Sequence, residues 1–291
     1  MNLVVGHIAY ANCVPFFHHL RAAGFGGEII SGVPAELNRM LAAGKIDVSP
    51  CSSFEYGRNW REYLLLPGFS ISTRGPVHSV LLFSPKPLAH LEATQIALTG
   101  ESASSVNLLK ILLQEFIGLR QVSYVLPETP VEQWIAAGGS ALLIGDRALK
   151  MAQSYPADGI YDLGELWYRH TGLPFVFALW ILRRAAAREK GAEVGQLLTQ
   201  LNQSRRLAFA DLPGLASVVP ERSWMSEAGL VDYWRTMAYG LDAEQIRGLE
   251  LFFRLCHRHG LLPEMPELHF FPSPAEAPEW SPTQACAEAA R

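Results

Sequence analysis

The chain has 291 residues, 49% of them hydrophobic and 18% charged, and its mean hydropathy is +0.11. This composition predicts a globular protein with a large core, and usual domain sizes predict about two domains. The net charge of −4 and the lack of a dense lysine or arginine block argue against nucleic acid as a partner, because phosphate binding relies on clustered cations.

The N-terminal residues carry no basic segment, and Gly6-His7 interrupts their apolar run, so they do not resemble a signal peptide. The best apolar run, Leu173–Leu182, has about half of the ~20 residues that a membrane span needs. We therefore expect a cytoplasmic protein, with neither a membrane nor an obligatory protein partner. No metal-binding spacing links the cysteines, which we expect to be free thiols: Cys13, Cys51, Cys256 and Cys286.

The stretch Ile46–Tyr56 predicts a short buried strand that runs directly into a helix. The strand is expected to end before Pro50, whose ring stops the ladder, and Ser52 or Ser53 is expected to begin the helix. The free N–H groups of a first helical turn and the helix dipole attract anions, so a carboxylate can bind there without lysine or arginine. The alternative is that the serines only cap the helix.

The same strand-to-helix pattern recurs elsewhere in the first half of the chain. The further junctions are Val4–Ile8 before Asn12, Ile96–Thr99 before Ser102–Ser105, and Ala141–Ile144 before Gly145-Asp146. In open α/β sheets ligands bind at the carboxyl ends of the strands. The sequence therefore predicts that these junctions line one crevice.

The alternation of strands and helices, followed by helices almost to the end, predicts an α/β protein of two lobes with a helical C-terminal portion. The expected domains are residues 1–84 plus 183–271 as lobe I, 85–182 as lobe II, and a disordered tail at 272–291. A lobe interrupted by a second one is the layout of the type II periplasmic-binding-protein fold. In that fold a cleft between the lobes closes on a ligand.

A series of motifs runs from the N-terminus to about Trp180: Tyr10-Ala11-Asn12, Pro34-x-x-Leu37-Asn38-x-x-Leu41-x-x-Gly44, Asp47-Val48-Ser49-Pro50-x-Ser52-Ser53-Phe54-Glu55-Tyr56, Ser70-Ile71-Ser72-x-x-Gly75-Pro76-Val77-x-Ser79-Val80, Ser102-x-x-Ser105-Val106-x-Leu108-Leu109, Gly145-Asp146-x-Ala148-Leu149 and Thr171-Gly172-Leu173-Pro174-Phe175-Val176-Phe177-Ala178. In order and spacing this series resembles the MqnA family, the chorismate dehydratases of the futalosine route to menaquinone. Two positions depart from the family pattern: Ala11 replaces a larger apolar residue, and Ser104 replaces a frequent threonine.

The resemblance implies that the protein removes water from chorismate to give 3-[(1-carboxyvinyl)oxy]benzoate, with chorismate as its small-molecule partner and with no cofactor or metal. Loss of the C3 proton and the C4 hydroxyl leaves an aromatic ring, so the reaction is thermodynamically favourable. Serine-rich helix starts suit the two carboxylates of chorismate, one in each lobe. We favour a substrate-assisted elimination, in which the enolpyruvyl carboxylate takes the C3 proton of its own molecule.

Asn12 and Asp146 are the expected catalytic residues. Asn12 would orient a carboxylate or the departing hydroxyl, whereas Asp146 is either the base or a helix-cap or hinge residue. The proton acceptor, the group that assists hydroxide loss, the oligomeric state and the roles of Arg74, Arg147, His7 and His78 stay open at this point. The expected substrate contacts are Ser52, Ser53, Ser79, Thr99, Ser102, Ser104, Ser105 and Gly145.

Other functions on the same fold are alternatives. A solute-binding protein for a transporter should carry a secretory or lipoprotein signal. The related 1,4-dihydroxy-6-naphthoate synthase has a different N-terminal signature, which Tyr10–Pro15 does not resemble. A transcription-factor effector domain would need a helix-turn-helix, for which there is no room before the first strand.

Overall fold

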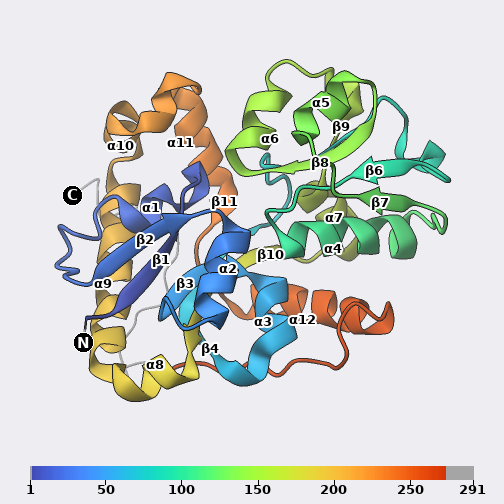
Figure 1. The fold of residues 1–291 in the computed structure, drawn as a ribbon. Coiled ribbons are helices and arrows are strands. Elements are labelled where there is room, and N and C mark those ends of the chain that lie inside the picture. Colours follow the sequence, from blue (N-terminus) through green and yellow to red (C-terminus); the bar gives the residue numbers. More distant parts are fainter. Residues whose placement is uncertain (1, 273–291) are drawn as a thin grey trace.

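The computed structural model describes residues 2–272, whose strands form two separate sheets with helices around them (Figure 1). This is the mixed α/β architecture that the sequence predicts. The first sheet has the order β11-β4-β10-β3-β1-β2, with β1 (Val4–Ile8), β2 (Glu28–Gly32), β3 (Val48–Ser52), β4 (Tyr63–Thr73), β10 (Phe175–Arg183) and β11 (Met237–Ala238). The second has the order β7-β6-β8-β5-β9, with β5 (Val80–Phe83), β6 (Gln95–Ala97), β7 (Ser123–Val125), β8 (Ser140–Ile144) and β9 (Ile160–Asp162).

Strand directions bring the predicted strand-to-helix junctions to common edges. In the first sheet β1 is parallel to β3, and in the second sheet β6 is parallel to β8. Parallel strands end at the same edge of a sheet, so the segments that follow β1 and β3 lie together, as do those that follow β6 and β8. Each sheet thus presents a pair of junctions.

The crossings between the sheets differ from the expected boundaries at residues 84 and 182. The strand β5 pairs with β8 and β9, so the first crossing lies between Thr73 and Val80. The strand β10 pairs with β3 and β4, so the chain has already returned to the first sheet at Phe175. All of β5 is apolar, and so is β10 up to Leu182. Apolar strands fit the interior of either sheet, so composition alone did not show which sheet each strand belongs to.

Helices cover the faces of both sheets. They are α1 (Val14–Phe17), α2 (Pro34–Ala42), α3 (Ser53–Asn59), α4 (Ala103–Ile111), α5 (Val131–Ala136), α6 (Gly145–Ala152), α7 (Leu163–Thr171), α8 (Arg184–Glu189), α9 (Gly191–Ala210), α10 (Leu212–Val218), α11 (Glu227–Thr236) and α12 (Ala243–Arg258), with short turns η1 (Ala11–Cys13), η2 (Trp60–Glu62), η3 (Leu88–His90), η4 (Leu112–Phe116), η5 (Ala157–Gly159) and η6 (Pro220–Ser223). Helix α4 contacts both α7 and the first-lobe elements α3, α12 and β10, so it joins the lobes. Within residues 2–272 no helix combines the length and apolar character needed to cross a bilayer.

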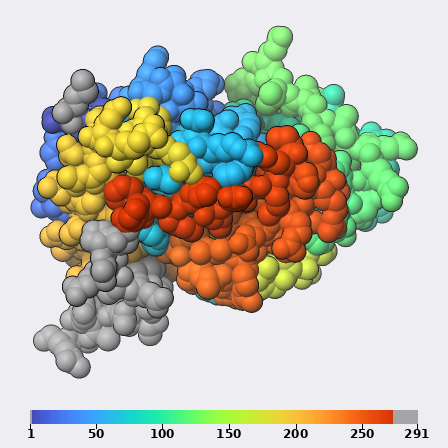
Figure 2. Space-filling view, turned by 90° about the horizontal axis from the view of Figure 1, so that it is seen from below, coloured from blue at the N-terminus to red at the C-terminus, as the bar shows by residue number. Residues whose placement is uncertain are grey.

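The chain after α12 runs back along α3 and β4, where it forms the red band beside the cyan segment in Figure 2. The Leu65 N–H donates to the His269 carbonyl at 2.8 Å, and the Tyr56 hydroxyl donates to the Glu267 carbonyl at 2.7 Å. The C-terminal segment up to Pro272 is therefore part of lobe I. The expectation of a disordered tail falls on residues 273–291, outside the described part of the chain, except at Pro272.

Pro50 does not stop its strand, contrary to the sequence prediction. It lies within β3, opposite Trp180 of the antiparallel neighbour β10. On the other side of β3, the ladder with β1 includes only Val48. The missing N–H of the proline therefore interrupts no pairing on the β1 side, and the strand continues to Ser52.

A buried ion cluster joins the start of the first sheet to the helical portion. The Asp47 carboxylate accepts hydrogen bonds from Lys190 Nζ at 2.6 Å and from Arg183 at 3.1 Å. It also accepts the Val4 N–H at 2.9 Å. Burial by itself would raise the pKa of Asp47, but these donors outweigh it and lower the pKa below its usual value.

We expect Asp47→Asn to lower the free energy of unfolding at pH 7 by about 3 kcal/mol, because it leaves the buried Lys190 and the half-buried Arg183 without their carboxylate. A carboxyl whose pKa is lowered by folding stabilises the protein above its unfolded pKa, about 4, and loses that contribution as the pH falls through the folded pKa. The difference in the free energy of unfolding between variant and wild type, measured with urea, should therefore become smaller below about pH 4. The exposed Asp158→Asn is the control, and an equal difference at pH 7 and pH 3 would contradict the assignment.

Candidate active site

A cavity lies between the two sheets, where the strand-to-helix junctions of both lobes meet. Its walls comprise Ile8, Tyr10, Asn12, Pro34, Ser52, Ile71, Val77, Ser79, Val80, Ser102, Ser105, Ile144, Gly145, Phe177, Ala178 and Met237. No lysine, arginine or carboxylate is among these described lining residues. A bound anion would therefore be held by hydroxyl, amide and backbone donors and by helix dipoles, as the sequence predicts.

The helix starts of α3 and α4 cap each other across the lobes. The Ser104 N–H donates to Ser52 Oγ at 3.0 Å, and the Phe54 N–H donates to Ser104 Oγ at 3.0 Å. Ser104 Oγ also lies 2.8 Å from the hydroxyls of both Ser52 and Ser53. Ser52 occupies the N-cap position of α3, as the sequence predicts, but its hydroxyl makes no cap bond to α3 and bonds α4 of the other lobe instead. The hydroxyls of Ser53 and Ser104 form hydrogen bonds within this cluster, and neither residue lines the cavity.

The first turn of α4 presents two more hydroxyls to the cavity. Ser102 Oγ accepts the Ser105 N–H at 3.3 Å and lies 3.0 Å from Ser105 Oγ, so Ser102 caps the helix while both side chains line the cavity. Thr99 is buried, and its hydroxyl donates to Glu101 Oε2 at 3.2 Å. Thr99 supports the loop and does not line the cavity.

Gly145 allows α6 to approach Tyr10 closely. Its φ is +59°, and an added Cβ would lie 2.7 Å from a carbon of the Tyr10 ring, so a larger residue would be strained and would also clash. The Gly145 N–H donates to the Ser79 carbonyl at 2.7 Å. The Ser79 hydroxyl, at the cavity wall, accepts a hydrogen bond from the buried Tyr233 hydroxyl at 2.8 Å.

Asn12 is the cavity side chain with an unused polar group. It belongs to the turn η1 that follows β1, and its Oδ1 is buried without a hydrogen-bond partner. Leaving a buried amide oxygen unpaired costs free energy, and a ligand in the cavity would complete the bonding of this one. The structure thus places Asn12 in the cavity wall, and its expected catalytic role stays a prediction.

Asp146 does not line the cavity, although the sequence offers it as a catalytic carboxylate. It occupies the first turn of α6, and its Oδ1 accepts the Ala11 N–H of the other lobe at 3.0 Å. Burial raises the pKa of Asp146, and the bond from Ala11 opposes that shift. Asp146 makes no side-chain cap bond to its own helix, and its carboxylate instead bonds the backbone of the other lobe.

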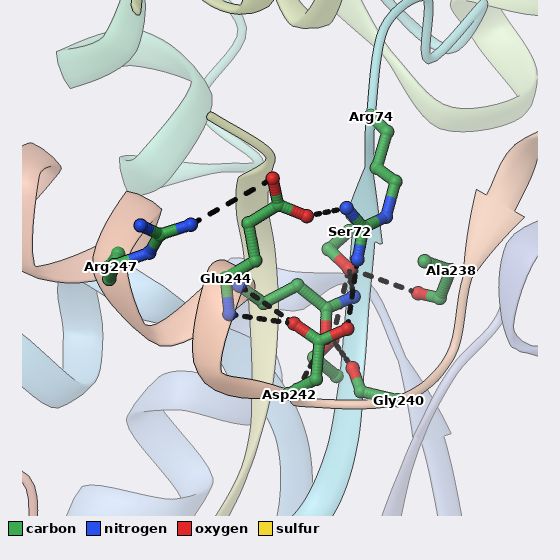
Figure 3. Close-up of polar contacts among 9 residues, drawn as sticks. Ser72, Arg74, Ala238, Gly240, Asp242, Glu244 and Arg247 are labelled. Atoms are coloured by element: carbon green, nitrogen blue, oxygen red, sulfur yellow. Dashed lines mark hydrogen bonds and ion pairs between the residues drawn. The ribbon is translucent and has the colours of Figure 1, made fainter. Parts of the chain in front are cut away.

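The two arginines left open by the sequence are both neutralised by the protein itself. Arg147 donates to Glu132 at 2.6 and 2.7 Å and to Glu101 at 3.1 Å. Glu101 also accepts the Tyr10 hydroxyl at 3.2 Å, which adds another bond between the lobes. Figure 3 shows Arg74 beside Asp242 and Glu244 at the start of α12, where it forms ion pairs with both. Neither guanidinium lines the cavity.

The two histidines left open also lie outside the cavity wall. The His7 ring packs against the Phe17 ring at a tilt of 32°, and burial lowers the pKa of His7 to about 4, so it is neutral at pH 7. The His78 N–H donates to Asp162 at 2.7 Å, and its side chain borders a separate hollow between α6 and α11.

Cys13, Cys51 and Cys256 are buried free thiols, and Cys286 lies outside the described residues. Across residues 2–272, no group of three His, Cys, Asp or Glu side chains is placed to hold a metal ion.

Sequence reasoning missed the contribution of the C-terminal portion to the site. Met237 of β11 lines the cavity, and Tyr233 of α11 holds Ser79. The helical spacing of this region predicts a packed core, and no local pattern distinguishes a residue that reaches the cleft. Phe177 lines the cavity, whereas Phe175, two residues earlier in β10, is buried in the core.

Comparison with known proteins adds what geometry alone does not give. The sequence profile of a family described as "Menaquinone biosynthesis" matches residues 3–258. The chain belongs to this family. The resemblance to the MqnA proteins in the N-terminal motifs is thereby confirmed, and the match extends into the helical portion.

Two relatives of this menaquinone biosynthesis family member carry the name chorismate dehydratase. The protein from Thermus thermophilus is 36% identical over 265 residues, which cover 86% of this chain and 93% of that protein. The protein from Campylobacter jejuni is 30% identical over 182 residues, or 60% of this chain and 66% of that one. The first similarity extends over most of both chains.

Solved structures show the fold of the family member. A protein from Archaeoglobus fulgidus aligns with a TM-score of 0.71 at 17% identity and covers 89% of this chain and 98% of its own. The alkanesulfonate-binding protein SsuA from Xanthomonas axonopodis aligns at 0.68 and 18%, covering 91% and 95%. A Candida albicans protein described as having the generic periplasmic-binding-protein fold aligns at 0.66 and 10%, covering 91% and 92%. The expected periplasmic-binding-protein-like fold is confirmed.

Proposed function

We propose that the protein is a hydro-lyase that removes water from chorismate to give 3-[(1-carboxyvinyl)oxy]benzoate. The cavity carries this proposal: hydroxyls at helix starts of both lobes surround a buried amide oxygen without a partner. Membership of the menaquinone biosynthesis family and the similarity to two chorismate dehydratases support it. The expected cytoplasmic location and the lack of an obligatory protein partner stay predictions.

The reaction balances without an oxidant or reductant. The C3–H bond breaks, its electron pair completes the aromatic ring, and the C4–O bond breaks to release the hydroxyl. The proton and the hydroxyl leave as one water. Because the reaction is thermodynamically favourable, the protein has only to lower its activation barrier, which it does by holding the reacting groups and stabilising developing charge.

The polarity of the cavity fits a dianion held by neutral donors. Ser102 and Ser105 sit at the positive end of α4, and Ser52 sits where β3 meets α3. These positions suit one carboxylate in each lobe, because helix starts favour negative charge. The Asp146 carboxylate bonds to Ala11, and the histidines lie outside the wall, so the described lining residues include no carboxylate or imidazole that could serve as a base.

The enolpyruvyl carboxylate of chorismate then serves as the base toward its own C3 proton. An intramolecular base needs no ionisable side chain and gains its rate from fixed orientation. In this proposal Asn12 holds either this carboxylate or the departing C4 hydroxyl. The binding roles of Ser79 and Gly145 are part of the same proposal.

The test is purified protein incubated with chorismate, followed by ultraviolet absorbance and mass spectrometry. We expect a product lighter than chorismate by one water, with an aromatic spectrum. Unchanged chorismate would contradict the proposal. Binding of chorismate without turnover would favour a solute-binding protein, and failure to bind it would favour the related naphthoate synthase.

A further inference from the structure

The turn that carries Asn12 is held at both backbone groups of the preceding residue. The Ala11 N–H donates to Asp146 Oδ1 at 3.0 Å, and the Ala11 carbonyl accepts the Trp234 indole N–H at 2.8 Å. Ala11 is fully buried, so water cannot replace either partner. The orientation of the adjacent Asn12 side chain therefore depends on two long-range bonds.

The partners in these two bonds belong to different lobes. Trp234 belongs to α11, which contacts η1 within lobe I. Asp146 belongs to α6 of lobe II, whose strand β8 lies in the second sheet. The bond from Trp234 can persist when the lobes separate, whereas the bond to Asp146 exists only while they are together.

We propose that Asp146 is a positioning residue, which takes the Ala11 N–H when the lobes close and thereby fixes Asn12 in its working orientation. The inference rests on the proposed function, and it gives Asp146 a role other than that of the base. Lobe closure and assembly of the site then become one event, because the bond that joins the lobes also fixes the amide.

The surroundings of Asp146 agree with a hydrogen-bonding role. Its carboxylate bonds to Ala11 and does not line the cavity. The charged side chains that act on it are Glu221 and Lys150. Holding an N–H group requires an acceptor oxygen and no negative charge. Asp146→Asn keeps such an oxygen in the same place, whereas Asp146→Ala removes it.

The two variants therefore separate a positioning residue from a base. We expect Asp146→Ala to lower kcat about 100-fold, the usual effect of a small misplacement, with a smaller change in KM. The kcat of Asp146→Asn should be at least about tenfold higher than that of Asp146→Ala, because asparagine restores the acceptor oxygen without the charge. Equal loss in both variants would overturn the proposal, since a base loses its function with either change.

A double-mutant cycle with Asn12→Ala gives a second kinetic criterion. If Asp146 acts through Asn12, adding Asp146→Ala to Asn12→Ala should cost less than about threefold in kcat. A full further 100-fold loss in the double variant would show that Asp146 acts independently of Asn12, and would overturn the proposal.

Amide hydrogen exchange tests the same bond without any reaction. In the ligand-free protein, Asp146→Ala should speed exchange in the peptide covering residues 9–13 by about tenfold, while Asp146→Asn should change it much less. Exchange in the β8 peptide, residues 140–144, is the control for general loosening. Unchanged exchange at residues 9–13 in Asp146→Ala would overturn the positioning role. If the wild type leaves chorismate unchanged, the proposed function fails, while exchange still decides whether Asp146 holds the turn.

Discussion

Replacing Asn12 by alanine is expected to lower kcat for chorismate dehydration about 100- to 1000-fold while changing KM by less than about threefold. The amide lies in the cavity wall with an unpaired oxygen, so its bonding is completed only by the bound molecule. The helix-start hydroxyls would still bind the carboxylates in the variant. An interaction that strengthens as the C4–O bond breaks affects kcat more than binding. Steady-state kinetics, followed by product absorbance, measures both constants.

Asn12→Asp is the matched variant for this prediction. It preserves the shape of the side chain but adds a negative charge to a cavity that lacks cations among its described lining residues. We therefore expect a marked rise in KM in addition to the loss of kcat, because the substrate is itself a dianion. Normal turnover by Asn12→Ala would remove Asn12 from the mechanism.

The second large effect is expected at Ser104, although it does not touch the cavity. Ser104→Ala removes the acceptor of the Phe54 N–H and the hydroxyl neighbour of Ser52 and Ser53, all of which are buried. Each buried group left unpaired costs about 1–3 kcal/mol. Because the cluster joins the lobes, that cost falls on the closed form, and we expect KM to rise about 10- to 100-fold.

Ser104→Thr is the control, since it retains the hydroxyl on the same carbon. Its KM for chorismate, and its Kd for the reaction product measured by isothermal titration, should both stay within about threefold of the wild-type values. The same rise in both variants would show that packing at this position, and not the hydrogen-bonded cluster, governs closure. An unchanged KM in Ser104→Ala would contradict the prediction directly.

The sequence predicts the segments that build the site because their signals are local. A short apolar strand, a small polar residue and a helix start follow one another at Asn12, Ser52, Ser102 and Gly145, and the structure brings these residues to one cavity. Parallel strands make that outcome predictable from order alone, because their carboxyl ends share an edge. Individual side-chain roles are less accessible.

The contacts that sequence reasoning did not predict join distant segments of the chain. Ser52 is an ordinary cap residue by its local pattern, yet it bonds α4 because the lobes bring that helix against it. Asp146 has the pattern of a base or a cap, and its partner Ala11 lies 135 positions away in the chain. Pro50 is a strand breaker by propensity, but the ladder with β1 ends at Val48 and tolerates it. Such outcomes follow from tertiary packing, which overrides local preference.

The most direct test of this account compares chorismate with an analogue in which a primary amide replaces the enolpyruvyl carboxylate. The amide keeps the shape and hydrogen-bonding capacity of the group but cannot accept the C3 proton at neutral pH. We predict that the wild-type protein aromatises chorismate with loss of water, and that it binds the analogue but leaves it unchanged. Turnover of the analogue at a similar rate would show that a protein group is the base, and no conversion of chorismate itself would contradict the function assigned to the cavity.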